Sequence, residues 1–171
     1  METLAFLFSA AGTVCVCVPP LLKGKRMGSI LFLLSLGNTL VAISYFLTGA
    51  YNGGVSCAIG AVQTTINFFF ERKEKPIPKW LIGIYAAAFI GINLLVYTQP
   101  ADLIAILACL TFIGCVGQKT GKSYRLWAIC NCVLWLTYDL VSHAYGPVFT
   151  HSFMLALTLL GAFLHDREKQ T

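Results

Sequence analysis

The stretch KGKRMGSILFLLSLGNTLVAISYFLTGAYNGG, residues 23–54, decides the fold class of this chain. It opens with three cations in four residues, continues as the apolar run 27–47, and ends in a Tyr/Gly-rich turn. An α-helix needs about 20 consecutive apolar residues to cross a bilayer, and this run has that length. Lys and Arg are enriched in loops on the cytoplasmic side of membranes. Residues 27–47 are therefore predicted to form a transmembrane helix that starts at the cytoplasmic face.

The same pattern continues along the whole chain. Of its 171 residues, 57% are hydrophobic and 11% are charged, and the mean hydropathy is +0.76. A soluble domain carries about 25% charged residues, so this composition excludes a soluble enzyme and a disordered tail. We expect an all-α integral membrane protein with seven transmembrane helices, over residues 4–22, 27–47, 50–70, 78–97, 102–118, 124–142 and 146–164.

The cations predict the orientation. All twelve Lys and Arg lie in the loops after the first, third and fifth runs or in the C-terminal tail. The positive-inside rule then places the N-terminus outside and the C-terminus in the cytoplasm of a multi-pass protein of the inner (plasma) membrane. The cations are spread over separate short loops, so we expect no nucleic-acid partner.

An internal repeat accompanies this topology. A shift of 94 residues places Cys15 over Cys109 and Thr64 over Thr158, and a one-residue slip places Asn38 and Tyr45 over Asn131 and Tyr138. Both triplets of runs would begin outside and end inside, so a single helix must join them. We predict a first three-helix repeat over residues 1–75, a linker helix over 76–99 and a second, parallel repeat over 100–171. Such repeats place a solute site near the bilayer midplane.

Two blocks carry a family resemblance. The first, residues 34–70, includes FLTGAYNGGVS at 46–56, and the second, residues 100–145, includes YRLW at 124–127 and CVLWLTY at 132–138. They resemble the two halves of the YgjV-type bacterial inner-membrane protein family, which is similar to the SWEET/PQ-loop (MtN3-like) superfamily. The resemblance implies the 3+1+3 fold and, by analogy, transport of a small solute. The Pro-Gln pair of that superfamily is not intact here, which argues against a symmetric, proline-hinged gate.

Polar residues form stripes on three of the runs. On 50–70, Ser56, Gly60, Gln63 and Asn67 are spaced to share one helical face. We hypothesise that such stripes line a path in which amides and hydroxyls bind a polar solute. The alternative is hydrogen bonding between packed helices. The predicted solute-binding residues are Asn38, Tyr45, Gln63, Asn67, Asn131, Trp135 and Tyr138.

One acid lies well inside an apolar run. Asp139 could bind a cation or take up a proton, and His151, at a similar depth, is its candidate partner. The alternative for Asp139 is a carboxylate wetted by an outer vestibule, and for His151 a structural role. Tyr51 and Tyr145 are interpreted as interfacial anchors.

The seven cysteines all lie in the apolar runs, so we expect no disulfide framework. In each Cys-x-Cys pair the side chains diverge by about 200° on a helix, so we expect no metal site. No catalytic motif is present, and we expect neither an enzyme nor a cofactor.

The sequence therefore predicts a carrier, by uniport or proton coupling, whose partners are the lipid bilayer and a small polar solute. A homo-oligomer is left open. The alternative is a non-transporting receptor or adaptor on the same fold, which should carry a specific cytoplasmic surface. Here the inner loops are short and basic, which favours the carrier.

Overall fold

The computed structural model describes residues 2–22, 27–48, 51–95, 97, 100–141 and 145–166. Within them the chain forms seven α-helices, one short 3-10 helix and no strand. The elements are α1 (Glu2–Cys17), η1 (Pro19–Leu21), α2 (Gly28–Thr48), α3 (Tyr51–Arg72), α4 (Lys79–Leu95), α5 (Asp102–Val116), α6 (Gly121–Val141) and α7 (Tyr145–Asp166).

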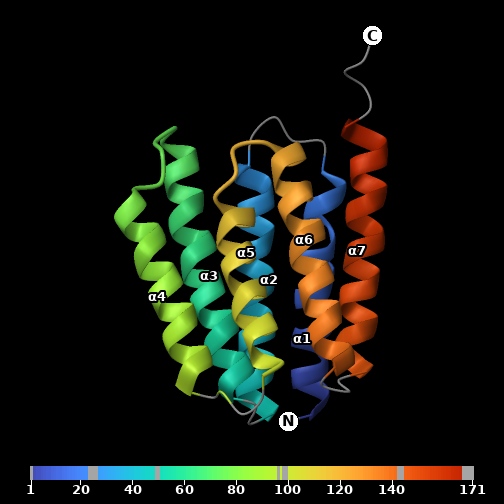
Figure 1. Ribbon diagram of the computed structural model, residues 1–171. Coiled ribbons are helices and arrows are strands. Elements are labelled where there is room, and N and C mark those ends of the chain that lie inside the picture. The colour runs from blue at the N-terminus through green and yellow to red at the C-terminus, as the bar shows by residue number, and fades with distance from the viewer. Residues whose placement is uncertain are drawn as a thin grey trace.

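The helices run side by side along one axis (Figure 1). Each packs on its neighbours in the sequence, and α1 also packs on α7, so the seven helices close into a ring. The view shows α5 in front of α2 and α6 in front of α1. The first and last helices therefore bring the two predicted halves into contact.

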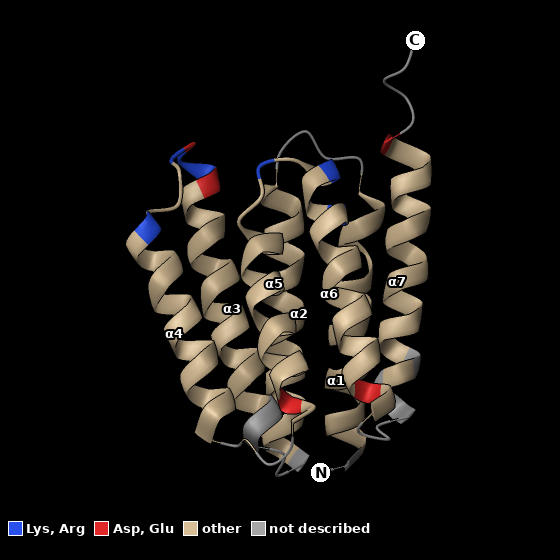
Figure 2. Ribbon diagram, viewed as in Figure 1, with Lys and Arg blue, Asp and Glu red and all other residues tan. Residues whose placement is uncertain are grey.

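Charge divides the bundle into two ends (Figure 2). Every described Lys and Arg lies at the end where α3 ends and α4 and α6 begin, which we call the basic end. Asp102, at the start of α5, and Asp139, near the end of α6, lie toward the opposite end. The sequence predicts that the Lys and Arg residues lie on one side of the bundle, and the described residues agree. Which end faces the cytoplasm stays a prediction.

Two local features end helices at the basic end. Pro19 and Pro20 follow α1, and because proline lacks an N–H the chain continues as the tight turn η1. After α3, Glu74 adopts a left-handed conformation (φ 54°), and the Lys75 N–H bonds the Phe70 carbonyl at 3.0 Å. This is the αL stop that helices commonly use, with glutamate in the place usually taken by glycine.

Apolar side chains fill two interior regions. The basic-end cluster joins α2, α5 and α6, and comprises Met27, Ile30, Leu31, Leu34, Cys115, Val116, Tyr124 and Ala128. The α4–α5 cluster comprises Leu81, Tyr85, Phe89, Cys109 and Ile113. Large apolar side chains are also exposed on the outer face of all seven helices, from Phe6 on α1 to Phe163 on α7. Apolar residues outside and polar residues inside suit a bundle surrounded by lipid.

The helices match the predicted runs closely but not completely. α2 and α3 begin and end within two residues of the predicted 27–47 and 50–70. The first run, 4–22, is divided by the proline turn. By length and composition, Thr3–Leu21 and Gly28–Leu47 pass as membrane spans, while Lys79–Leu95 and Asp102–Val116 are apolar but shorter. The buried polar residues of α3 and α6 lower their mean hydropathy, so the count of seven spans stays a prediction.

The two predicted repeats have matching helices. α1, α2 and α3 have 16, 21 and 22 residues, and α5, α6 and α7 have 15, 21 and 22. The aligned Thr64 and Thr158 are both fully buried, and each hydroxyl donates to the carbonyl four residues earlier at 2.7 Å. These correspondences agree with the repeat, which, like its boundaries at residues 75 and 100, remains a prediction.

Candidate functional site

Polar side chains are buried at several levels of the bundle. Those nearly inaccessible to solvent are Ser44, Gln63, Thr64, Asn67, Arg125, Asn131, Asp139 and Thr158. A buried polar group is costly unless it forms a hydrogen bond. The hydrogen-bond partners of these residues therefore separate groups that join helices from groups that have no partner among the described residues.

Two of the predicted solute-binding amides have buried atoms without a partner. Within the described residues, Gln63 forms no hydrogen bond through either Nε2 or Oε1, although the side chain is completely buried. The buried Nδ2 of Asn38 is also unpartnered. A Cβ built on Gly60 would lie 3.5 Å from this Nδ2 and 3.6 Å from the ring of Phe112. Asn38, Gly60 and Phe112 thus meet in mid-bundle, one helical turn from Gln63.

The other two predicted amides are hydrogen-bonded between helices. Asn67 donates to the Val116 carbonyl at 3.2 Å and accepts from the Tyr85 hydroxyl at 3.4 Å, joining α3 to α5 and α4. Asn131 donates to the Ala108 carbonyl at 2.6 Å and to the Thr111 hydroxyl at 3.1 Å, joining α6 to α5. Such contacts are typical of the packing role that the sequence left as the alternative, and solute binding by these two residues stays a prediction.

Asp139 and His151 form a close pair between α6 and α7. Nδ1 of His151 lies 2.6 Å from Oδ2 of Asp139. The Asp139 residue is 3% exposed, whereas the His151 side chain is 21% exposed. The partnership that the sequence suggested is therefore present in the structure, with a nearly buried carboxylate and a partly exposed imidazole.

Aromatic residues surround this pair. Trp135 stacks on the His151 ring, with centroids 5.6 Å apart and planes 7° from parallel. Tyr138 meets Trp135 edge-on at 5.8 Å, and its hydroxyl donates to Asp102 at 3.3 Å. Tyr45 of α2, which is 36% exposed, is within electrostatic reach of Asp139. Four predicted site residues thus lie together at the end opposite the basic end, with Tyr45 nearby. The four are Trp135, Tyr138, Asp139 and His151.

A junction that the sequence did not predict holds the basic end together. The buried guanidinium of Arg125 forms an ion pair with Asp166 and donates to the Leu22 carbonyl at 3.2 Å. His165 donates from Nε2 to the Leu21 carbonyl at 2.8 Å. These contacts join η1 to α6 and α7. The signal available in the sequence was Arg125 itself, a cation at the second position of the apolar run 124–142.

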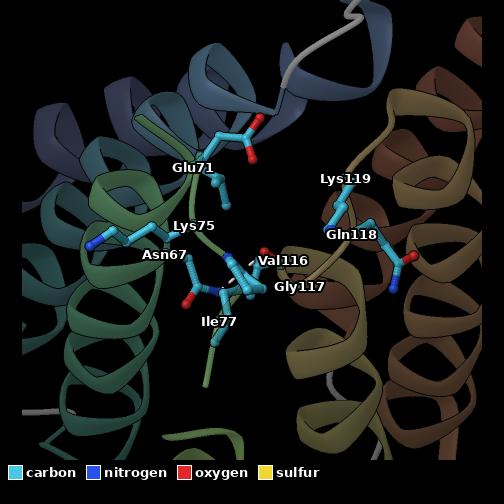
Figure 3. Close-up of a pocket in the computed structure, with 10 residues that line it drawn as sticks. Asn67, Glu71, Lys75, Ile77, Val116, Gly117, Gln118 and Lys119 are labelled. Carbon is cyan, nitrogen blue, oxygen red and sulfur yellow. Dashed lines mark hydrogen bonds between the residues drawn. The ribbon is translucent and has the colours of Figure 1, made fainter. Parts of the chain in front are cut away.

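The basic end also contains a small pocket (Figure 3). Asn67 and Glu71 of α3 and Val116, at the end of α5, line it together with the segments that follow these helices. It is a small, partly open hollow with charged and apolar side chains in its lining.

Some predicted features lie outside what the structure describes. One is Ser142, whose spacing places it on the same helical face as Asn131, Trp135 and Tyr138. The side chains of Tyr51 and Tyr145 are others. Within the described part of the chain, no three His, Cys, Asp or Glu side chains are grouped so that they could hold a metal ion.

A bundle of long helices with apolar outer faces, several buried polar side chains and its described cations at one end is consistent with a helical membrane protein. The model of the Imp-YgjV family, described as a bacterial inner membrane protein, matches residues 8–169, and the chain belongs to this family. The family resemblance of the two sequence blocks is thereby confirmed. No curated protein and no solved structure matches the chain.

Proposed function

We propose that this inner-membrane protein is a carrier for a small polar solute, which it moves without chemical conversion. The solute binds in mid-bundle between two parallel three-helix halves, and access alternates between the two ends. The halves are residues 1–75 and 100–171, joined by the helix within 76–99, with the N-terminus outside and the C-terminus inside. This arrangement is similar to the one expected for the SWEET/PQ-loop superfamily.

The observation that carries the proposal is the unpartnered amide of Gln63. Leaving a buried hydrogen-bonding group unsatisfied costs about 1–3 kcal/mol, and Gln63 leaves both a donor and an acceptor unused. The unpartnered donor of Asn38 lies beside Gly60 on the same face of α3. A solute that carries both a donor and an acceptor would satisfy these atoms on binding.

Packing at the basic end and the similarity of the two halves support alternating access. At the basic end, the basic-end cluster and the Arg125 junction bring α2, α5, α6, α7 and η1 together. Close packing of this kind is what a state closed toward the basic end requires, and it supports alternating access. The matching helix lengths of the two triplets support halves that can move as equivalent units.

Gln63→Met provides the test. Methionine fills a similar volume without the unpartnered polar atoms, so the variant should be more stable than wild type by about 1–3 kcal/mol. It should also lose any stabilisation by solutes. Thermal unfolding of purified protein, screened against sugars, amino acids, nucleosides and vitamins, measures both effects.

Asn67→Leu is the matched control on the same helix. It removes an amide that already has two hydrogen-bond partners, so it should lower stability and leave solute-dependent stabilisation in place. Loss of stability in Gln63→Met, with solute stabilisation unchanged, would contradict the proposed site. Uptake of the stabilising solute by proteoliposomes distinguishes a carrier from a receptor, because a receptor binds the solute without moving it.

A further inference from the structure

The Asp139–His151 pair changes its net charge when it loses one proton. With both ring nitrogens of His151 protonated, imidazolium and carboxylate cancel each other. With a proton on Nδ1 alone, shared with Oδ2 at 2.6 Å, the pair carries one negative charge. A buried charge without compensation costs several kcal/mol. Loss of the second proton therefore creates a strong demand for a cation next to Asp139.

The groups around the pair suit an organic cation. Trp135 stacks on His151 and meets Tyr138 edge-on, so two electron-rich aromatic rings lie beside the pair, and such rings attract cations. Two further ionisable groups lie around the pair: Asp102, which accepts from Tyr138, and Tyr45, which is within electrostatic reach of Asp139 and of Cys57. No described Lys or Arg lies at this end of the bundle. The described charged side chains around the pair are therefore acidic, apart from His151.

An anionic solute would find no counter-charge on this path. Arg125 is the only described Lys or Arg that is buried, and it is bound to Asp166 and the Leu22 carbonyl at the basic end. A neutral solute could satisfy the amides of Asn38 and Gln63, but it would leave the charge of a deprotonated pair unbalanced.

From these contacts, and resting on the proposed carrier function, we propose that the solute is an organic ammonium ion that exchanges for a proton at Asp139 and His151. The Nε2 proton of His151 leaves through the exposed edge of the ring to the water at that end. The ammonium ion then neutralises the pair. One proton is released for each singly charged cation bound, so the net charge of the occupied pair stays zero.

The pair lies between the end of the bundle and the amides. Asp139 is eight residues beyond Asn131 on α6, about 12 Å along the helix axis. A cation that enters from this end meets the pair first. Its hydroxyl or amide groups can then reach Asn38 and Gln63 as it moves deeper.

Proton flux driven by quaternary ammonium ions tests the proposal. Purified protein is reconstituted into liposomes that contain a pH-sensitive dye, and choline or tetramethylammonium chloride is added outside under a potassium–valinomycin voltage clamp. These ions cannot carry protons across lipid, so alkalinisation of the lumen reports exchange by the protein. Wild type should respond at least tenfold above protein-free liposomes. Ser152→Ala, an exposed neighbour of His151, should behave as wild type.

The variants separate the two steps. Asp139→Asn should lose the flux at least tenfold, and Asp139→Glu should restore part of it. His151→Gln should lose the proton flux but keep thermal stabilisation by choline, because the carboxylate remains. An unchanged proton flux in Asp139→Asn would overturn the assignment of the site. So would an Asp139→Glu variant that folds and binds choline but shows no proton flux.

The proposed function fails in a different way. If neither choline nor tetramethylammonium moves protons, while a neutral solute stabilises the protein through Gln63 and is taken up by proteoliposomes, the ammonium proposal is wrong and the carrier proposal stands. If no solute of either kind binds, both proposals are wrong.

Discussion

Replacement of Gly161 by alanine is expected to lower the thermal unfolding temperature by about 6–12 °C. A Cβ at this position on α7 would lie 2.8 Å from the carbonyl carbon of Pro20 and closer still to its oxygen. The obstacle is buried backbone in η1, so no side-chain rotation relieves it. Overpacking of this kind costs about 3 kcal/mol, and each kcal/mol shifts the unfolding temperature of a chain of this size by about 2–4 °C.

Gly91→Ala is the matched control for this substitution. Gly91 also lies within a helix, α4, but a Cβ there would have no neighbour within 4 Å. The unfolding temperature of the Gly91→Ala variant should stay close to that of wild type in the same detergent. Equal unfolding temperatures for Gly161→Ala and Gly91→Ala would show that η1 does not pack on α7 as described.

Asp166→Ala should destabilise the protein by about 3–5 kcal/mol, because it leaves the Arg125 guanidinium buried without a counter-charge. Arg125 is 3% exposed, so its guanidinium would lose its counter-charge in a largely buried position. The effect should be visible as a large fall in unfolding temperature. Unfolding by a denaturing detergent titrated into mild micelles measures the same loss at constant temperature.

Two further variants isolate the ion pair. Arg125→Met combined with Asp166→Leu removes both charges, and the double variant should recover most of the stability that Asp166→Ala loses. Lys122→Ala removes an exposed cation one turn earlier on α6 and should have little effect. The role assigned to Arg125 would be wrong if Asp166→Ala and Lys122→Ala lost the same amount of stability.

The helices were largely predictable because their signal is local. The basic cluster at 23–26 and the apolar run 27–47 define α2 to within one residue at each end. The proline turn at 19–21 was less predictable, because the whole stretch 4–22 is apolar and hydropathy does not register a missing N–H. The αL stop at Glu74 was also missed, since glutamate rarely takes that conformation.

The site was predictable in part. Asp139 and His151 lie at a similar depth in two consecutive predicted helices, which made them candidate partners. The structure pairs them. Asn38 and Asn131 occupy corresponding positions in the predicted repeats but have different surroundings. Asn38 lies beside Gly60, whereas Asn131 meets the Ala108 carbonyl and the Thr111 hydroxyl. Periodicity assigns a face to a residue but not the partner that it meets there.

The contacts of the Arg125 junction could not be predicted from local sequence patterns. Arg125 bonds a carbonyl 103 residues away in the sequence, and His165 bonds one 144 residues away. Contacts between the first and last helices depend on how the ring closes, which no local pattern contains. The sequence could indicate that a buried cation needs a partner, but Asp166 was only one of several acids available.

The depth of the Asp139–His151 pair has an electrical consequence for a carrier of cations. Asp139 lies two residues before the end of α6, about 3 Å of helix rise, whereas the hydrocarbon core is about 30 Å thick. A proton that binds there crosses roughly a tenth of the transmembrane field. At 100 mV a full crossing is worth about 2.3 kcal/mol per charge, so this step changes by only about 0.2 kcal/mol. Movement of the cation onward to Gln63 would carry the voltage dependence, and protonation would respond chiefly to pH.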